Sequence, residues 1–162
     1  MIDISVEEIK PFMSRLFGQA AFDDFLLIEA DIVTDCSLHV TGRRNPEWYD
    51  TEQLELAPEL GRPWITWGEK KALLFAAIRG HKSPQRMTIT LKACETWAAP
   101  RMEKMGAGVV YEQYHPDLFL HIRFGQGELH LVTGTAFASF TMDRSIEQGW
   151  DSYIRHVFGE NT

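Results

Sequence analysis

The sequence has only two cysteines, Cys36 and Cys94, among its 162 residues. Their spacing matches no zinc-binding motif and no redox pair, so we expect two free, buried thiols in a reducing compartment. No stretch approaches the roughly 20 consecutive apolar residues that a membrane-spanning helix needs. The segment Met1–Ile4 has no basic region followed by an apolar run, which argues against a signal peptide. The expected compartment is therefore the cytoplasm, without a role at a membrane.

The familiar motifs of catalysis and cofactor binding are also missing. The sequence contains no glycine-rich phosphate loop, no nucleophile elbow, no paired-histidine zinc helix and no calcium loop. These absences do not exclude an enzyme, because a fold can assemble catalytic groups from distant parts of the chain. They leave no sequence-based reason to assign a cofactor.

Positive charge is scarce. The 16 lysines and arginines stand against 23 aspartates and glutamates, which gives a net charge of −7. Neutralisation of phosphates supplies nearly all non-specific affinity for nucleic acids, so this balance argues against a nucleic-acid-binding protein. One weaker alternative in this class is an accessory protein that uses local basic residues, namely Arg43, Arg44, Arg79, Lys82 and Arg86.

The residues that are present describe a globular domain. Apolar residues make up 44% of the chain and aromatic residues 12%. A chain of this length buries about 70% of its unfolded surface, so it needs no disulfide or metal ion to fold. We expect a single domain over residues 1–162.

Two segments, 24–42 and 117–135, have the alternating pattern of β-hairpins. Further strands are expected at 87–91 and 136–141. With the helices described below, this order predicts an α+β fold with a mainly antiparallel sheet built from two similar hairpins and covered by three or four helices. The similarity of the hairpins fits an ancient duplication, but it also fits chance, because Val and Thr are common in strands.

Helices are predicted from capping boxes and apolar periodicity. The box Ser5–Glu8 predicts a helix over 5–17, and the box Thr66–Glu69 precedes a helix that ends before Gly80. The second of these helices is apolar nearly all round, which is typical of a helix that is buried on most sides. The other predicted helices are 95–105 and one with an apolar stripe from Ile146 to Phe158.

The second hairpin offers candidate ligand-binding residues. A two-residue loop at Gln126-Gly127 would place Arg123 opposite His130, and Phe119 and His121 would share the same face. Histidine, arginine and an aromatic ring together could bind an anion or act as acid and base. The alternative is an ordinary sheet face exposed to solvent.

The first hairpin offers a weaker candidate for a metal site. A loop with an odd number of residues, Thr34–Cys36, would place Glu29, Asp31 and His39 on one face, within reach of one metal ion. Opposite charges across strands also stabilise sheets by about 0.2–1 kcal/mol without a metal, so we assign none. If the two hairpins join, their polar faces would form one surface.

The segment 43–62 is irregular and contains the neighbouring aromatic residues Trp48 and Tyr49. Irregular segments of this length inside a compact domain are often functional, and aromatic residues in loops are enriched at interfaces. Trp48 and Tyr49 are therefore candidate interface residues, for example in self-association. The competing interpretation is that both rings fold down onto the core.

Four segments of the chain form a recognisable set, namely Phe12–Leu16, Phe22–Ala30, Gly42-Arg43 and Asp143–Asp151. Together they resemble a small family of uncharacterised bacterial proteins of about this length. The family carries no assigned activity, so the resemblance implies no catalytic residue, cofactor or substrate.

The sequence alone does not assign a function. It favours a non-catalytic binding or interaction module in the cytoplasm, plausibly a homodimer, whose partner is an unidentified small molecule or protein. The main alternative is a small enzyme that uses the histidines and Arg123 on the polar sheet face. The nucleic-acid accessory protein is the weakest of the three.

Overall fold

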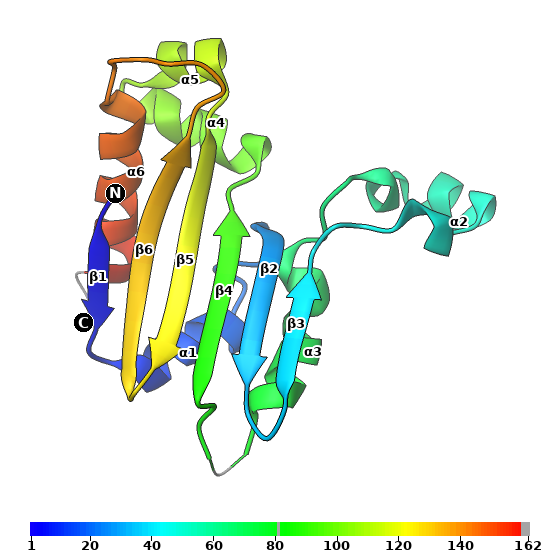
Figure 1. Cartoon of the computed structure of the whole chain (residues 1–162). Helices are drawn as coiled ribbons and strands as arrows, with labels where there is room; N and C mark the ends of the chain where they lie inside the picture. Colours follow the sequence, from blue (N-terminus) through cyan, green and yellow to red (C-terminus); the bar gives the residue numbers. More distant parts are fainter. Residues whose placement is uncertain (81, 160–162) are drawn as a thin grey trace.

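Six antiparallel strands form one sheet in the order β1-β6-β5-β4-β2-β3 in the computed structural model, which describes residues 1–80 and 82–159 (Figure 1). The predicted α+β fold with two antiparallel hairpins is confirmed. The strands are β1 (Asp3–Val6), β2 (Leu26–Val33), β3 (Ser37–Thr41), β4 (Arg86–Lys92), β5 (Asp117–Gly125) and β6 (Glu128–Ala136). The α-helices of the described residues are α1 (Ile9–Gly18), α2 (Thr51–Leu56), α3 (Trp67–Ile78), α4 (Glu95–Lys104), α5 (Gly108–Tyr114) and α6 (Ser145–Ile154).

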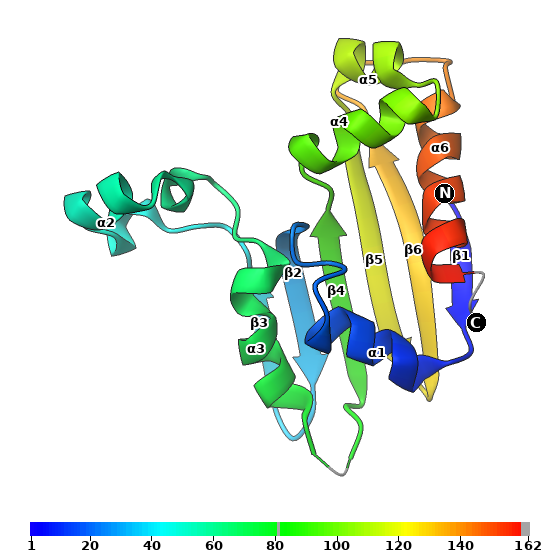
Figure 2. The same ribbon diagram turned by 180° about the vertical axis from the view of Figure 1, so that it is seen from behind.

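The sheet has one covered and one uncovered face. Figure 2 shows α1, α3, α4 and α6 lying against one face, whereas Figure 1 shows no helix in front of the other. Successive strand residues point to opposite faces, so the apolar half of each strand packs under the helices and the polar half faces outward. Fully buried strand residues include Ile32, Ile89, Leu91, Leu120, Ile122 and Leu131.

Both hairpins have the predicted loops. Three residues connect β2 and β3, and Asp31 pairs with His39. Gln126 and Gly127 connect β5 and β6 with φ of 54° and 76°, the left-handed conformation that a two-residue hairpin turn needs. The hairpins do not pair directly, because β4 lies between β2 and β5.

The predicted helix at 5–17 is wrong in its first turn. Asp3–Val6 is a strand, in which Ser5 pairs with His130 of β6, and α1 begins only at Ile9. The local capping pattern is outcompeted by strand pairing with a segment more distant in the sequence. Pro11 then lies in the first turn of α1, where proline is tolerated because its missing N–H would have no helical partner.

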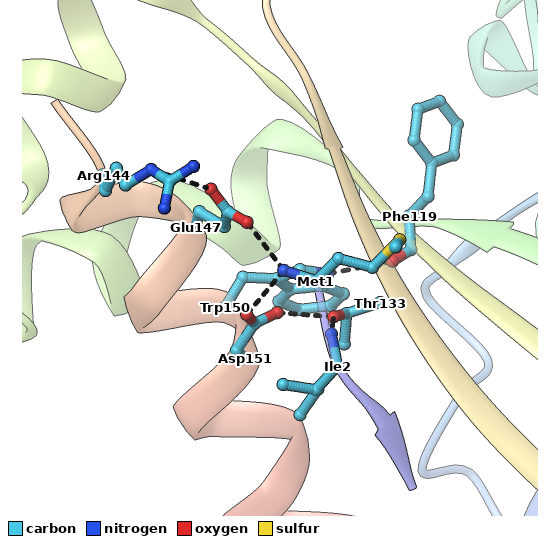
Figure 3. Close-up of polar contacts among 8 residues, drawn as sticks. All are labelled: Met1, Ile2, Phe119, Thr133, Arg144, Glu147, Trp150 and Asp151. Carbon is cyan, nitrogen blue, oxygen red and sulfur yellow. Dashed lines mark hydrogen bonds and ion pairs between the residues drawn. The ribbon is translucent and has the colours of Figure 1, made fainter. Parts of the chain in front are cut away.

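The N-terminal strand is held against the last helix by a network of polar contacts (Figure 3). The α-amino group of Met1 donates to Glu147 Oε1 at 2.7 Å and to Asp151 Oδ2 at 2.9 Å. Asp151 also accepts from the hydroxyl of Thr133, which accepts from the N–H of Ile2 at 3.0 Å. The network therefore ties β1, β6 and α6 together and fixes β1 at the edge of the sheet.

Several smaller predictions are corrected. The chain forms no strand between Phe137 and Thr141, and α2 and α5 are additional to the three or four helices expected. Cys36 is exposed and Cys94 is partly exposed, so neither thiol is buried as expected. The end of the chain beyond Gly159 lies outside the described residues. No helix among the described residues has the length and apolar content needed to cross a bilayer.

Candidate binding site on the uncovered sheet face

The uncovered face brings together all the residues that the sequence predicts on the polar faces of the two hairpins. Phe119 precedes His121 by two residues on β5 and shares its face. One row across the six strands consists of Ser5, His130, Arg123, Thr88, Asp31 and His39. The adjacent row consists of Asp3, Val132, His121, Thr90, Glu29 and Thr41. The polar faces therefore form one surface, although β4 lies between the hairpins.

Two arginines and a histidine line one concavity of this face. Arg86 comes from β4, Arg123 from β5 and His130 from β6. Arg86 and Arg123 are exposed, and neither guanidinium group makes an ion pair or hydrogen bond with any described residue. Thr88, which pairs with Arg123, adds a hydroxyl group to the same concavity. The carboxylate of Glu128 also lines the concavity, where it lies beside His130. The concavity thus offers the hydroxyl group of Thr88 and two unpaired guanidinium groups.

His130 offsets the negative charge of two neighbouring carboxylates at this concavity. Its Nδ1 lies 2.8 Å from Asp3 Oδ1 and its Nε2 lies 3.4 Å from Glu128 Oε2. The hydrogen bond with Asp3 and then that with Glu128 raise the pKa of His130 above its usual value. A protonated imidazole is therefore favoured beside Arg123.

His121 has the opposite electrostatic environment. Burial, and then the charge of Arg123, lower the pKa of His121, so its neutral form is favoured. Its Nδ1 lies 3.1 Å from the hydroxyl oxygen of Thr90, which is itself buried. The ring stacks on Phe119 with centroids 6.2 Å apart and planes 20° apart. Phe119 and His121 thus form a flat, uncharged platform next to the cationic concavity.

Glu29, Asp31 and His39 lie together as the sequence predicts. One ligand atom from each lies within 4.8 Å of the others, a separation compatible with one metal ion. Asp31 and His39 already pair with each other at 2.6 Å, and their side chains are 47% and 55% exposed. This pair satisfies both groups without a metal, so the geometry supports a cross-strand ion pair as readily as a ligand set.

The candidate interface residues Trp48 and Tyr49 have different environments in the structure. They belong to a projection, here called the arm (residues 46–61), which contains α2 and two short 3-10 turns and extends beyond the β3 edge (Figure 1). Trp48 is 80% exposed, so it does not fold onto the core. Tyr49 instead accepts a hydrogen bond from Arg44 at the base of the arm.

Arg44 is not available to contact a nucleic acid. It is buried and forms two hydrogen bonds of 3.1 Å to the carboxylate of Glu69. Arg43 lies over the ring of Trp64 at 5.7 Å. Among the basic residues proposed for a nucleic-acid contact, Arg44 therefore has a structural role instead.

Sequence reasoning missed Arg86 and Thr88 as site residues. The sequence indicates only that Arg86 ends a basic turn, because alternation within β4 does not reveal which strands flank it. Arg86 lies between Val33 of β2 and Gly125 of β5, and only the strand order places it in the concavity beside Arg123.

A family model covers most of the chain. It matches residues 15–162 and is described as a family of unknown function, DUF5721. The chain belongs to this family. No curated protein and no solved structure matches the chain. Membership of DUF5721 confirms the resemblance seen in the sequence and names no activity.

Proposed function

We propose that this DUF5721 protein is a binding module that holds a small anionic molecule on the uncovered face of its sheet. The observation that carries the proposal is the pair of exposed guanidinium groups, Arg86 and Arg123, which line one concavity without a carboxylate partner among the described residues. We place it in the bacterial cytoplasm, where the exposed thiol of Cys36 would stay reduced.

The residue types define the ligand chemistry. The planar guanidinium group donates two parallel hydrogen bonds to a carboxylate or phosphate, and Arg is the preferred residue for such recognition. Two like charges side by side repel each other, and a bound anion relieves that repulsion. Thr88 supplies a further donor in the same space.

The neighbouring aromatic platform suggests the rest of the ligand. Phe119, His121 and Arg123 alternate along β5, so each lies about 7 Å from the next on the same face. A ligand with an anionic group near Arg123 and a flat apolar part near His121 and Phe119 would use both features. We therefore propose a small aromatic or planar carboxylate or phosphate ester as the ligand class.

Calorimetric titration with phenyl phosphate and with inorganic phosphate tests this proposal. We expect saturable binding of both, with phenyl phosphate bound more tightly. Arg123→Ala should weaken binding about 10- to 100-fold, since a charge-assisted hydrogen bond contributes about 1.5–3 kcal/mol. Phe119→Ala should remove the advantage of phenyl phosphate and leave the affinity for inorganic phosphate unchanged.

The matched control for these variants is Arg155→Ala, which removes an exposed arginine outside the uncovered face. It should bind both probes as the wild-type protein does. Equal affinities for wild type, Arg123→Ala and Arg155→Ala would contradict the proposed site, because binding would then not depend on the guanidinium group in the concavity.

Anion binding should depend on pH through His130. The groups that face it are Asp3, Glu128 and Arg123, and its raised pKa keeps it protonated to a higher pH than a free histidine. Affinity for phenyl sulfate, whose own charge is constant, should be highest in mild acid and fall as the pH rises through the raised pKa. His130→Gln should give a flat profile between about pH 6 and 8. A wild-type profile as flat as that of His130→Gln would show that the imidazole takes no part.

A further inference from the structure

The exposed side of α3 is unusually apolar. The sequence predicts a helix buried on most sides, but only Trp67 and Leu74 are buried. Leu73 is 57% exposed and Phe75 is 46% exposed. Ala72, Ala76 and Ala77 are exposed beside them. A helix that is apolar all round is normally covered on all sides. The prediction that α3 is buried on most sides is wrong, because no other described element covers its outer side.

The arm has complementary properties. It projects from the same edge of the molecule as α3 (Figure 2). Trp48 and Leu56 on the arm are 80% and 79% exposed. Residues 46–61 include five acidic residues and no basic residue, namely Glu47, Asp50, Glu52, Glu55 and Glu59.

The charges around α3 have the opposite sign. Residues 70–86, from α3 through the following turn, contain no acidic residue. Lys70, Arg79 and Lys82 lie in this stretch, and the last two are exposed. An acidic surface with exposed apolar side chains and a basic surface with exposed apolar side chains thus occur on one chain.

Hydrogen bonds pair the two chain segments at the base of the arm, which extends away from its own α3 (Figure 2). The N–H of Arg44 donates to the carbonyl of Pro63, and the N–H of Ile65 donates to the carbonyl of Gly42, both at 2.8 Å. The side chain of Arg44 is also paired with Glu69 at the start of α3. These bonds hold together the two chain segments that enter and leave the arm.

We infer that a second copy of this chain covers α3. In this dimer the arm of each protomer would dock on α3 of its partner, with Trp48 and Leu56 against Leu73 and its neighbours Ala76 and Ala77. Phe75 lies on the other flank of α3, where its ring contacts Phe17. A twofold axis makes the two contacts equivalent, which gives a closed dimer. The acidic side chains of the arm would then face Arg79 and Lys82 of the partner.

The first test is the mass in solution, measured by light scattering during gel filtration. The wild-type protein should have twice the 18.6 kDa mass of the chain. Trp48→Ala and Leu73→Ala should each weaken the dimer about 10-fold or more, because buried aromatic and apolar anchors dominate interface energies. Both side chains are exposed in the protomer, so both variants should fold.

Mixing the two variants gives a sharper test. A dimer with one Trp48→Ala chain and one Leu73→Ala chain has both defects in one contact and leaves the other contact intact. The mixed dimer should therefore associate more tightly than either variant alone. Arm–arm or helix–helix pairing would predict no such gain, because every contact would then contain a defect.

Three outcomes would overturn the inference. They are a monomeric wild-type protein, a dimer that neither substitution weakens, and a mixture that associates no better than the separate variants. The test is independent of the proposed anion site, and Arg123→Ala should remain dimeric even if that site is confirmed.

Discussion

Replacing Gly42 with alanine should destabilise the protein by more than about 4 kcal/mol, a loss comparable to the whole stability of many domains. A Cβ atom at this position would lie 1.7 Å from the carbonyl oxygen of Leu27 and 2.7 Å from its carbonyl carbon. Neither strand can move aside easily. The N–H of Gly42 donates to Ile28 at 3.0 Å, and its carbonyl accepts from Ile65 at 2.8 Å. The clash is therefore with backbone that is held from both sides.

Urea unfolding measures this effect, and Gly61→Ala is the matched control. A Cβ at Gly61 would meet no atom within 4 Å, so its unfolding free energy should stay within about 0.5 kcal/mol of wild type. If Gly42→Ala does not accumulate as folded protein while Gly61→Ala does, the prediction also holds. A Gly42→Ala protein with wild-type stability would show that the close approach of Gly42 and Leu27 is not a feature of the fold.

Replacing Glu69 with alanine should cost about 2–4 kcal/mol. Removal of one partner from a fully buried ion pair typically costs about 3–5 kcal/mol, and we expect less here because the side chain of Glu69 is 36% exposed. Arg44 would keep its bonds to the carbonyls of Arg62 and Trp64 but would lose the carboxylate that neutralises it. The N–H of Thr66 would also lose the acceptor of the capping box.

The same pair should contribute to acid sensitivity. Burial alone would raise the pKa of Glu69, but the hydrogen bonds from Arg44 and Thr66 outweigh it and lower the pKa below its usual value. Stability from this group is therefore complete above the unfolded-state pKa of about 4.3 and is lost as the pH falls through the folded-state pKa. Unfolding free energies of wild type and Glu69→Ala should thus converge in acid.

Glu112→Ala is the control for both measurements. It removes an exposed acidic residue of α5, away from the arm, that has no ion pair or hydrogen bond with any described residue, so the unfolding free energy should change by less than about 0.5 kcal/mol. Equal stabilities for Glu69→Ala and Glu112→Ala would contradict a structural role for the buried Arg44.

Local signals were sufficient to predict the hairpins. Gln126-Gly127 adopts the left-handed turn that its residue types favour, and Asp31 lies opposite His39, a register that agrees with the apolar alternation and a three-residue loop. The capping box at Thr66 is likewise present. In these cases the residues that decide the structure are neighbours in the sequence.

Features that depend on distant segments could not be predicted. Ser5 and Glu8 satisfy a helix-capping pattern, but β1 forms because β6 offers an unpaired edge next to it. The base of the arm is held by Arg44 and its partner Glu69. The sequence predicts Glu69 only as part of a capping box. At the binding site, the pairing of one hairpin is enough to predict that Arg123 and His130 are neighbours. Arg86 lies in the same concavity because of the strand order, which the sequence does not reveal.

The most direct test of the proposed binding face is a nuclear magnetic resonance titration of the labelled protein with phenyl phosphate. We expect saturable shifts in the backbone amides of Thr88, His121, Arg123 and His130, all on the uncovered face. An Arg86→Ala, Arg123→Ala double variant should keep a folded spectrum and lose these shifts. Shifts confined to the helical face, or identical shifts in wild type and the double variant, would contradict binding at the concavity of Arg86 and Arg123.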